Sequence, residues 1–185
     1  MTGMTRYALF LRGVNVGGVT LKMADVAATL AGAGFGAVRT VLASGNVLVD
    51  SPDDVADVRS GAEAALRDSF GYEAWVLTYP VEEVRAVSRA YPFEREVQGH
   101  HSYVTFVADA DVLDELAALG EDPGPGERIA RGDGVLYWQV ARDHTLASAV
   151  GKTMGRKRYK SSTTTRNLRT VDKLLLSADS VHSRS

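Results

Sequence analysis

The sequence predicts an α+β fold made of two similar units in tandem, each with an antiparallel sheet and helices packed on it. The first observation is that strand-forming apolar runs alternate with segments of helical apolar spacing over residues 1–80, in the order βαββαβ. The second is that residues 102–185 repeat this order through its second helix, without a convincing final strand. A helix and loop over 81–101 connect the two units. We therefore predict tandem duplicated ferredoxin-like (βαββαβ) units with antiparallel sheets and a C-terminal helical segment.

The first unit opens with a strand, a glycine-rich loop and a helix. Residues 7–11 form an apolar run rich in strand formers, and the loop 13–18 follows. The next helix is marked by apolar residues at helical spacing and by the glycines that end it: Met23, Val26, Ala27 and Leu30, then Gly32, Gly34 and Gly36. Two β-branched runs, 38–42 and 47–49, are broken by residues 44–46, which predicts a tight turn or a bulge between strand segments.

The second helix of this unit has the clearest signals. Asp53 and Asp54 precede an apolar face that runs from Val55 to Phe70, and Gly71 follows it. Acidic residues favour the start of a helix and glycine favours its end. A strand over 73–79 completes the unit.

In the second half, Pro80 opens the connecting helix, and Asp133-Gly134 is a strong signal for a hairpin turn. The remaining predicted elements are a strand at 102–107, a helix at 112–117, a loop at 120–126, strands at 128–131 and 135–140, a helix at 145–154 and a last helix at 171–178.

Composition restricts the chemistry. A chain of 185 residues with 45% apolar content can bury a core, and the absence of cysteine excludes disulfides, thiolate metal sites and cysteine nucleophiles. No apolar run approaches the roughly 18 residues that a membrane helix needs. Arg6 lies directly before the first strand, so a leader pattern is missing. We therefore expect a cytoplasmic protein without a membrane partner.

Charge is divided unevenly along the chain. The formal net charge is −2, but residues 1–150 hold 12 Lys and Arg against 21 Asp and Glu, whereas residues 151–185 hold 9 against 2. An acidic body with a formal charge of −9 thus precedes a basic C-terminal region of +7. A local basic region attracts polyanions even when the total charge is near zero.

The loop from Arg12 to Gly18 has the setting of a phosphate-binding loop. Gly17 and Gly18 let backbone N–H groups approach an anion closely, while Arg12 and Asn15 add side-chain donors. The dinucleotide fingerprint is absent because Asn15 stands where glycine is needed, and the P-loop is absent because no Gly-Lys-Ser/Thr occurs. The alternative interpretation is a strand-to-helix turn that needs positive φ.

Ser44 and Asn46 are the second pair of candidate ligand-binding residues. A hydroxyl and an amide at a break between strands are typical of bulges beside functional sites. The spacing excludes a nucleophile elbow, because Leu42 stands two residues before Ser44. A purely structural turn is the alternative.

The run from residue 152 to 160, here called the basic run, carries five cations and no acid. Such a patch attracts phosphates, and Tyr159 among the charges has a ring that could stack on a base. The alternative is a solvated loop. The predicted nucleic-acid-binding residues are Lys152, Arg156, Lys157, Arg158 and Lys160.

Thr165, Arg166 and Asn167 follow the basic run in a hydroxyl-rich stretch. Hydroxyl, amide and guanidinium groups bind phosphate oxygens, and arginine can do so with two parallel bonds. The same residues are typical of a helix start, in which Thr165 or Asn167 caps the helix. The two interpretations are compatible, since a capped helix start also attracts anions.

Motifs spread along the chain resemble the bacterial family called domain of unknown function 1697. In order, they are residues 11–18 (LRGVNVGG), 22–23 (KM), 44–47 (SGNV) and 164–167 (TTRN), then Thr170-Val171 and Lys173-Leu174. The chain departs from the family at Leu168 and Arg169, where an aromatic residue and a second asparagine are common. The resemblance implies a tandem pair of ferredoxin-like units and lends no established activity.

Three functions stay open at this point. The first is binding of a phosphate-bearing ligand, a nucleic acid or a nucleotide, through the glycine loop and the basic region. The second is an enzyme for a small phosphorylated or carboxylated substrate, whose pocket joins Arg12, Asn15, Ser44, Asn46, Arg166 and Asn167. No proton-transfer residue stands out for it. The third is a structural or protein-interaction domain. We predict no cofactor and no metal, because the four histidines include no i, i+4 pair.

Overall fold

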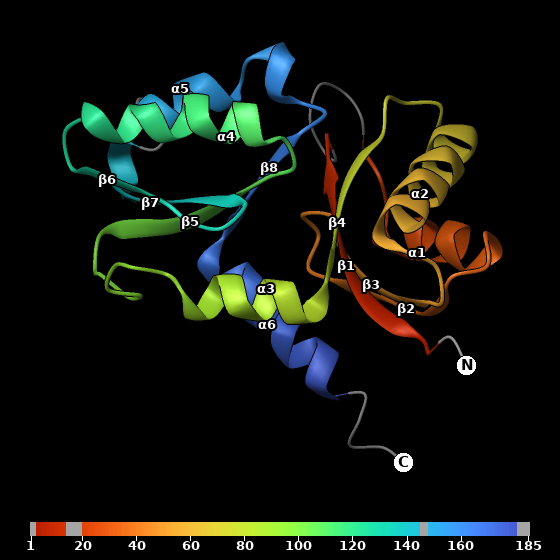
Figure 1. Cartoon of the computed structure of the whole chain (residues 1–185). Coiled ribbons are helices and arrows are strands. Elements are labelled where there is room, and N and C mark those ends of the chain that lie inside the picture. The colour runs from red at the N-terminus through yellow and green to blue at the C-terminus, as the bar shows by residue number, and fades with distance from the viewer. Residues whose placement is uncertain (1–2, 14–19, 145–147, 181–185) are drawn as a thin grey trace. The chain divides into compact units, whose positions relative to one another are not determined.

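The computed structural model describes residues 3–13, 20–144 and 148–180 (Figure 1). It confirms the predicted α+β class, with two four-stranded antiparallel sheets and a C-terminal helix. The chain divides into two compact units, called unit 1 (Met1–Arg85 with Lys173–Ser185) and unit 2 (Ala86–Asp172). The division falls inside two helices, α3 (Val81–Arg89) and α6 (Leu168–Ser180).

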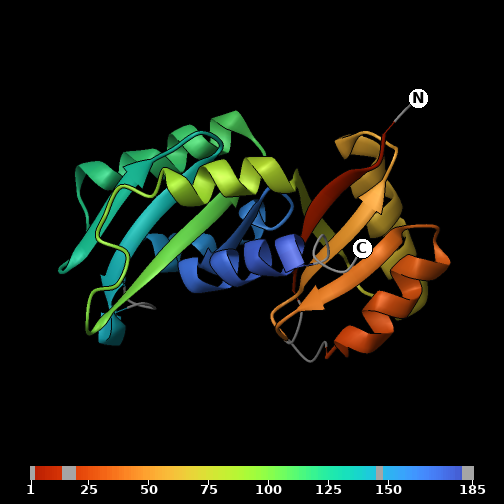
Figure 2. The ribbon, with the colours of Figure 1, turned by 90° about the horizontal axis from the view of Figure 1, so that it is seen from below.

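Unit 1 contains one sheet with two helices on the same face, as Figure 2 also shows. The strand order is β2-β3-β1-β4 and all neighbouring strands are antiparallel, which is the ferredoxin-like arrangement. Its elements are β1 (Thr5–Arg12), α1 (Met23–Gly32), β2 (Gly36–Val41), β3 (Asn46–Ser51), α2 (Val55–Phe70) and β4 (Trp75–Pro80).

Helix α2 begins and ends where its sequence signals predict. The Asp54 side chain accepts a hydrogen bond of 2.9 Å from the Asp57 N–H. Gly71 adopts a φ of 64° after the last turn, and its N–H donates to the carbonyl oxygen of Arg67 at 2.9 Å. A carboxylate satisfies unpaired N–H groups at a helix start, and glycine takes the left-handed conformation without Cβ strain. These two caps confirm the prediction for this helix.

The central strand β1 is buried on both faces. Leu9 and Leu11 belong to the core that α1 and α2 complete with Val26, Leu30, Val58 and Leu66. Ala8 and Phe10 point to the opposite face, since successive strand residues alternate, and they are also fully buried. Two-sided burial explains why this strand is an unbroken apolar run in the sequence.

Two arginines hold the last turns of α6 in unit 1. Arg6 Nε donates to Asp50 Oδ1 at 2.8 Å, while Arg6 Nη1 donates to the carbonyl oxygen of Ala178 at 2.8 Å. Arg85 Nη2 pairs with Asp179 Oδ1 at 2.8 Å. The C-terminal helix is therefore attached to both the sheet and α3.

Unit 2 repeats the architecture with strand order β6-β7-β5-β8, again antiparallel throughout. No helix within the described residues of the chain is long and apolar enough to cross a membrane. The elements of unit 2 are β5 (His100–Val107), α4 (Ala110–Ala117), η1 (Ala118–Glu121), β6 (Glu127–Arg131), β7 (Val135–Ala141), η2 (Arg142–His144), α5 (Ala149–Met154), η3 (Lys157–Tyr159) and β8 (Thr163–Asn167).

The expectation that unit 2 lacks a final strand is wrong, because β8 pairs with β5 over five residues. Its sequence consists of threonines, an arginine and an asparagine, so it has no apolar pattern that would mark a strand. Thr163 and Thr164 are nevertheless buried, and Thr165 is half-buried. Thr165 Oγ1 lies 2.8 Å from Thr105 Oγ1, which also accepts from Trp138 Nε1 at 3.0 Å. β-branched threonine suits a strand once its hydroxyl has a partner.

The buried carboxylate of Glu127 caps the start of α5. Glu127 is 6% exposed and lies on the edge strand β6. Its Oε2 accepts from the N–H groups of Gly124 (2.9 Å) and Ala149 (3.0 Å), and its Oε1 accepts from Val150 N–H (3.2 Å). Ser148 Oγ accepts the next N–H, that of Gly151, at 2.9 Å. Because α5 is short, these bonds replace the stability that further turns would provide.

We predict that Glu127→Ala lowers the free energy of unfolding by about 2–4 kcal/mol, because it leaves buried N–H groups without acceptors. Glu127→Gln keeps one oxygen acceptor and loses less. Urea unfolding followed by circular dichroism measures both variants. Glu121→Ala, at an exposed position, is the control. Equal stability of Glu127→Ala and the control variant would contradict this role.

We also predict a loss of stability at high pH that depends on Tyr137. Its hydroxyl donates to the carbonyl oxygen of Val87 at 2.7 Å, and burial, with a smaller effect of Asp133, raises the pKa of Tyr137 to about 12. An unfolded tyrosine ionises near pH 10, so the contribution is complete below about pH 10 and is lost as the pH rises towards 12. In thermal unfolding, Tyr137→Phe should show a shallower decline over this interval than the wild type. Identical slopes would refute the assignment.

Candidate phosphate-binding site

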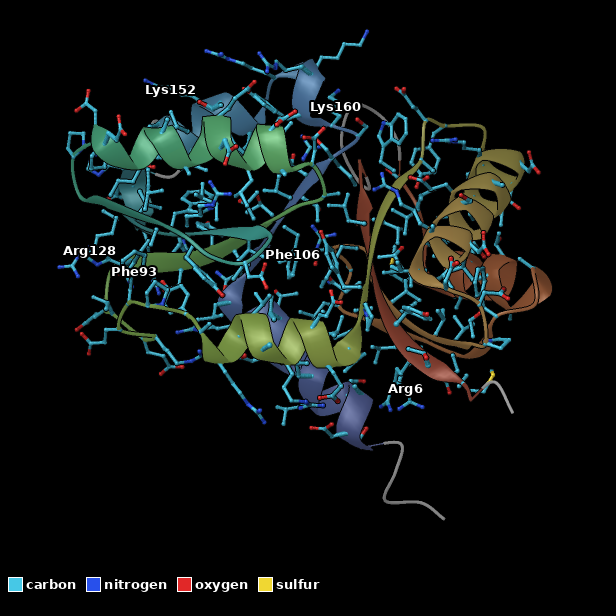
Figure 3. All side chains as sticks on the ribbon, in the orientation of Figure 1. Arg6, Phe93, Phe106, Arg128, Lys152 and Lys160 are labelled. Carbon is cyan, nitrogen blue, oxygen red and sulfur yellow. The ribbon has the colours of Figure 1, made fainter. Side chains whose placement is uncertain are left out.

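The basic run lies on the side of unit 2 that carries α4 and α5, where Figure 3 labels Lys152 and Lys160. All five of its cationic residues are exposed. Two other residues hold the run in place: Met154 and Tyr159 are 7% and 3% exposed and belong to the core beneath. The run therefore consists of exposed cations above an apolar underside.

Tyr159 is part of that underside. Its hydroxyl donates to Glu115 Oε2 at 3.0 Å, and burial together with this hydrogen bond raises the pKa of Tyr159. The expectation that its ring stacks on a base is wrong, because the ring is buried against the core. In the sequence Tyr159 stands between cations, and nothing nearby marks it as a core residue.

Glu115 also distinguishes Arg158 from its neighbours. The carboxylate on α4 forms an ion pair with Arg158, whose Cζ lies 4.9 Å from the centre of the Tyr159 ring. Glu115 lies 43 residues before Arg158, so local sequence holds no signal for this pair. In the described part of the chain, no carboxylate forms an ion pair with the other four cations of the run, Lys152, Arg156, Lys157 and Lys160.

The residues after the basic run are more enclosed. Arg166 is 8% exposed, and its Nη1 donates to Thr164 Oγ1 (2.7 Å) and to the carbonyl oxygen of Thr165 (2.8 Å). Asn167 Oδ1 accepts from Arg169 N–H at 2.9 Å, which makes Asn167 the N-cap of α6. The capping interpretation is thus confirmed for Asn167. Ligand binding by Thr165, Arg166 and Asn167 stays a prediction.

In unit 1, the antiparallel sheet brings Arg12 to the same end as the turn between β2 and β3. Phe10 pairs with Asn46, and Leu11 N–H donates to the carbonyl oxygen of Gly45 at 2.8 Å. Gly13 has a φ of 84°, which explains the glycine directly after Arg12. Burial lowers the pKa of Arg12. The remaining candidates of this loop, Asn15, Gly17 and Gly18, lie outside the described residues.

Asn46 has a defined structural role. Its side chain is fully buried, and Nδ2 donates to the carbonyl oxygen of Val41 (2.9 Å) and to Ser44 Oγ (2.8 Å). These bonds close the turn in which Leu42 and Gly45 have φ of 60° and 85°. Contact of Ser44 or Asn46 with a ligand stays a prediction, as does the joining of candidates from both units in one pocket.

The described residues contain no group of three or more His, Asp or Glu placed to hold a metal ion. The fold defines a class of α+β proteins with tandem ferredoxin-like units, here with a basic surface on the second unit. The chain belongs to the family described as "Protein of unknown function (DUF1697)", whose model matches residues 4–137. The match ends before the basic run.

Two solved structures are similar to the chain. One is "The structure of conserved bacterial protein SP0830 from Streptococcus pneumoniae", with 24% identity and a TM-score of 0.76 over 94% of this chain and 98% of that chain. It has the same fold. The other, "Crystal Structure of an Unknown Protein from Galdieria sulphuraria", has 12% identity and a TM-score of 0.28, covering 97% and 92% of the two chains. No curated protein matches the sequence.

We predict that Asn46→Ala lowers the free energy of unfolding by about 1–3 kcal/mol, because the buried Val41 carbonyl loses its side-chain donor. Ser44→Ala, at an exposed position, should cost less. Thermal or urea unfolding measures both variants. Should Asn46→Ala be as stable as the wild type, the amide would have no structural role and the case for ligand binding would strengthen.

Proposed function

We propose that the protein binds a phosphate-bearing ligand, specifically the sugar-phosphate backbone of a nucleic acid, through the basic run. The observation that carries the proposal is the set of four exposed cations, Lys152, Arg156, Lys157 and Lys160, that form no ion pair within the described residues. Phosphate groups are the anions that such a row of cations attracts most strongly, because binding releases the counterions condensed on the nucleic acid.

The same surface favours binding without base readout. The single aromatic residue of the run, Tyr159, is buried, so the run offers no ring for base stacking. Contacts to phosphates position a protein on nucleic acid but carry no sequence information. We therefore expect weak dependence on sequence, steep dependence on salt and dissociation constants of roughly 10⁻⁶ to 10⁻⁴ M near physiological ionic strength.

The acidic remainder of the chain restricts this binding to one surface. Residues 1–150 have a formal charge of −9, which repels a polyanion from most of the molecule. Glu115 further limits the attractive area, since it forms an ion pair with Arg158 within the run. Within the basic run, the unneutralised charge thus lies on four side chains.

Fluorescence anisotropy with labelled single-stranded DNA and RNA, measured over a series of salt concentrations, tests the proposal. For four phosphate contacts, log K should fall with log salt with a slope of about −3. The variant in which Lys152, Arg156, Lys157 and Lys160 are all changed to Gln should bind at least tenfold more weakly and should lose most of this slope.

Single substitutions provide the matched control. Lys157→Gln should reduce the slope by about 0.7, the value of one single-stranded phosphate contact. Arg128→Gln removes a cation that is also exposed but lies on β6 (Figure 3), and it should leave the slope unchanged. Absence of binding at low salt, or an unaltered slope in the fourfold variant, would refute the proposal.

A further inference from the structure

Unit 2 contains a small pocket where β5 begins, β7 ends and α6 begins. Its volume is about 150 Å³, below the roughly 300–1,000 Å³ of pockets that enclose a drug-sized ligand. The lining is mostly polar and comes from four separate segments of the unit. Its polar lining includes Arg95, His100, Ser102, Arg142, Asn167 and Arg169.

Strand pairing brings these segments together. His100 pairs with Ala141 at the end of β7, so Arg142 follows directly beside the start of β5. Tyr103 pairs with Asn167 at the end of β8, so β5 extends beyond β8 and runs alongside the start of α6. The register of strand pairing therefore determines where the pocket residues on these segments lie.

The charges around the pocket favour an anion. Three arginines line it, against the carboxylates of Glu96 and Asp172. Arg95 is paired with Asp172, so the attraction for an anion comes from Arg142 and Arg169. Both oxygens of Asp172 are already engaged: Oδ1 accepts from Ser88 Oγ at 2.6 Å and Oδ2 from Arg95 Nη2 at 2.7 Å. Arg95 Nη1 also donates to the carbonyl oxygen of Ser88 at 2.7 Å. This network holds Arg95 in position and leaves Glu96 as the one lining carboxylate without an ion pair among the described residues.

Hydrogen-bond donors complete the lining. Asn167 is oriented by the cap bond from its Oδ1, and its Nδ2 has no hydrogen-bond acceptor within the described part of the chain. The first N–H groups of α6 lie beside it and add a partial positive charge. Arg169 is exposed and forms no ion pair with a described residue. His100 Nδ1 lies 3.2 Å from the carbonyl oxygen of Gln98, which orients the ring.

We propose that this pocket binds a phosphomonoester, as a site separate from the basic run. Guanidinium groups match phosphate oxygens with paired hydrogen bonds, and several donors from different directions suit a tetrahedral dianion better than a planar carboxylate. The small volume accommodates the phosphate group and leaves the remainder of the ligand outside. The phosphomonoester belongs either to a small metabolite or to the 5′ end of a nucleic acid.

Isothermal titration calorimetry of the full chain with ribose 5-phosphate tests the proposal. We expect saturable 1:1 binding that weakens about tenfold or more in Arg169→Gln and in Arg142→Gln, since each removes a charge-assisted hydrogen bond to phosphate. Arg128→Gln, the exposed arginine on β6, should bind as the wild type does. Circular dichroism verifies that the variants are folded.

A second arm identifies the source of the phosphate. A short oligonucleotide with a 5′-phosphate is compared with the same oligonucleotide carrying a 5′-hydroxyl, in the wild type and in Arg169→Gln. Tighter binding of the phosphorylated form that is lost in Arg169→Gln assigns the pocket to a nucleic-acid end. Saturable binding of ribose 5-phosphate without such a gain assigns it to a small metabolite.

The experiment distinguishes failure of the pocket proposal from failure of the proposed nucleic-acid binding by the basic run. The fourfold Gln variant of the basic run should still bind ribose 5-phosphate with unchanged affinity. Absence of saturable binding to any phosphomonoester, or equal weakening by Arg169→Gln and Arg128→Gln, would overturn the pocket proposal, whatever the salt dependence of nucleic-acid binding turns out to be.

Discussion

The pairing of β5 with β7 on one side and with β8 on the other brings together segments that line the pocket of unit 2. Because both pairs are antiparallel, the end of β7, the start of β5 and the end of β8 lie at the same end of the sheet. The pocket forms at this end. The hydroxyl of Thr105 in the middle of β5 bonds to both neighbouring strands, through Thr165 and Trp138. A small hydrogen-bonded cluster therefore supports the register on which the pocket depends.

The role of each cation in this protein depends on whether it forms an ion pair with a carboxylate. Arg6, Arg85 and Arg95 each pair with a carboxylate and hold strands and helices together. Arg158 is paired with Glu115 in the same way, although it lies within the basic run. Exposed pairs contribute little to stability, about 0–1 kcal/mol each, so their larger effect is to remove positive charge from the surface. The four cations of the basic run without such a partner among the described residues keep their charge at the surface.

Local patterns were sufficient to predict much of the fold. The caps of α2 and the Asp133-Gly134 turn, where Gly134 has a φ of 69°, depend on residues adjacent in the sequence, and both were predictable. Strand β8 was missed because its threonine hydroxyls find partners on β5, about 60 residues earlier. A polar strand has no apolar signature, so only the long-range pairing reveals it.

The candidate site was less predictable than the fold for the same reason. The exposure of the basic run could be expected from its charge, but the burial of Tyr159 and its bond to Glu115 depend on α4, some 44 residues away. Asn167 could be predicted as a helix cap from its place before an apolar periodicity. The pocket beside it could not, because its arginines come from segments with no common motif.

The burial of Glu127 has a consequence for the proposed binding by the basic run. Its carboxylate holds the first turn of α5, and the basic run begins within that same short helix. The presentation of positive charge on one side of unit 2 thus requires a buried negative charge on an edge strand. Under the proposed function, a residue that lies outside the basic run, and whose own charge has the opposite sign, is therefore able to set how tightly that run binds phosphate.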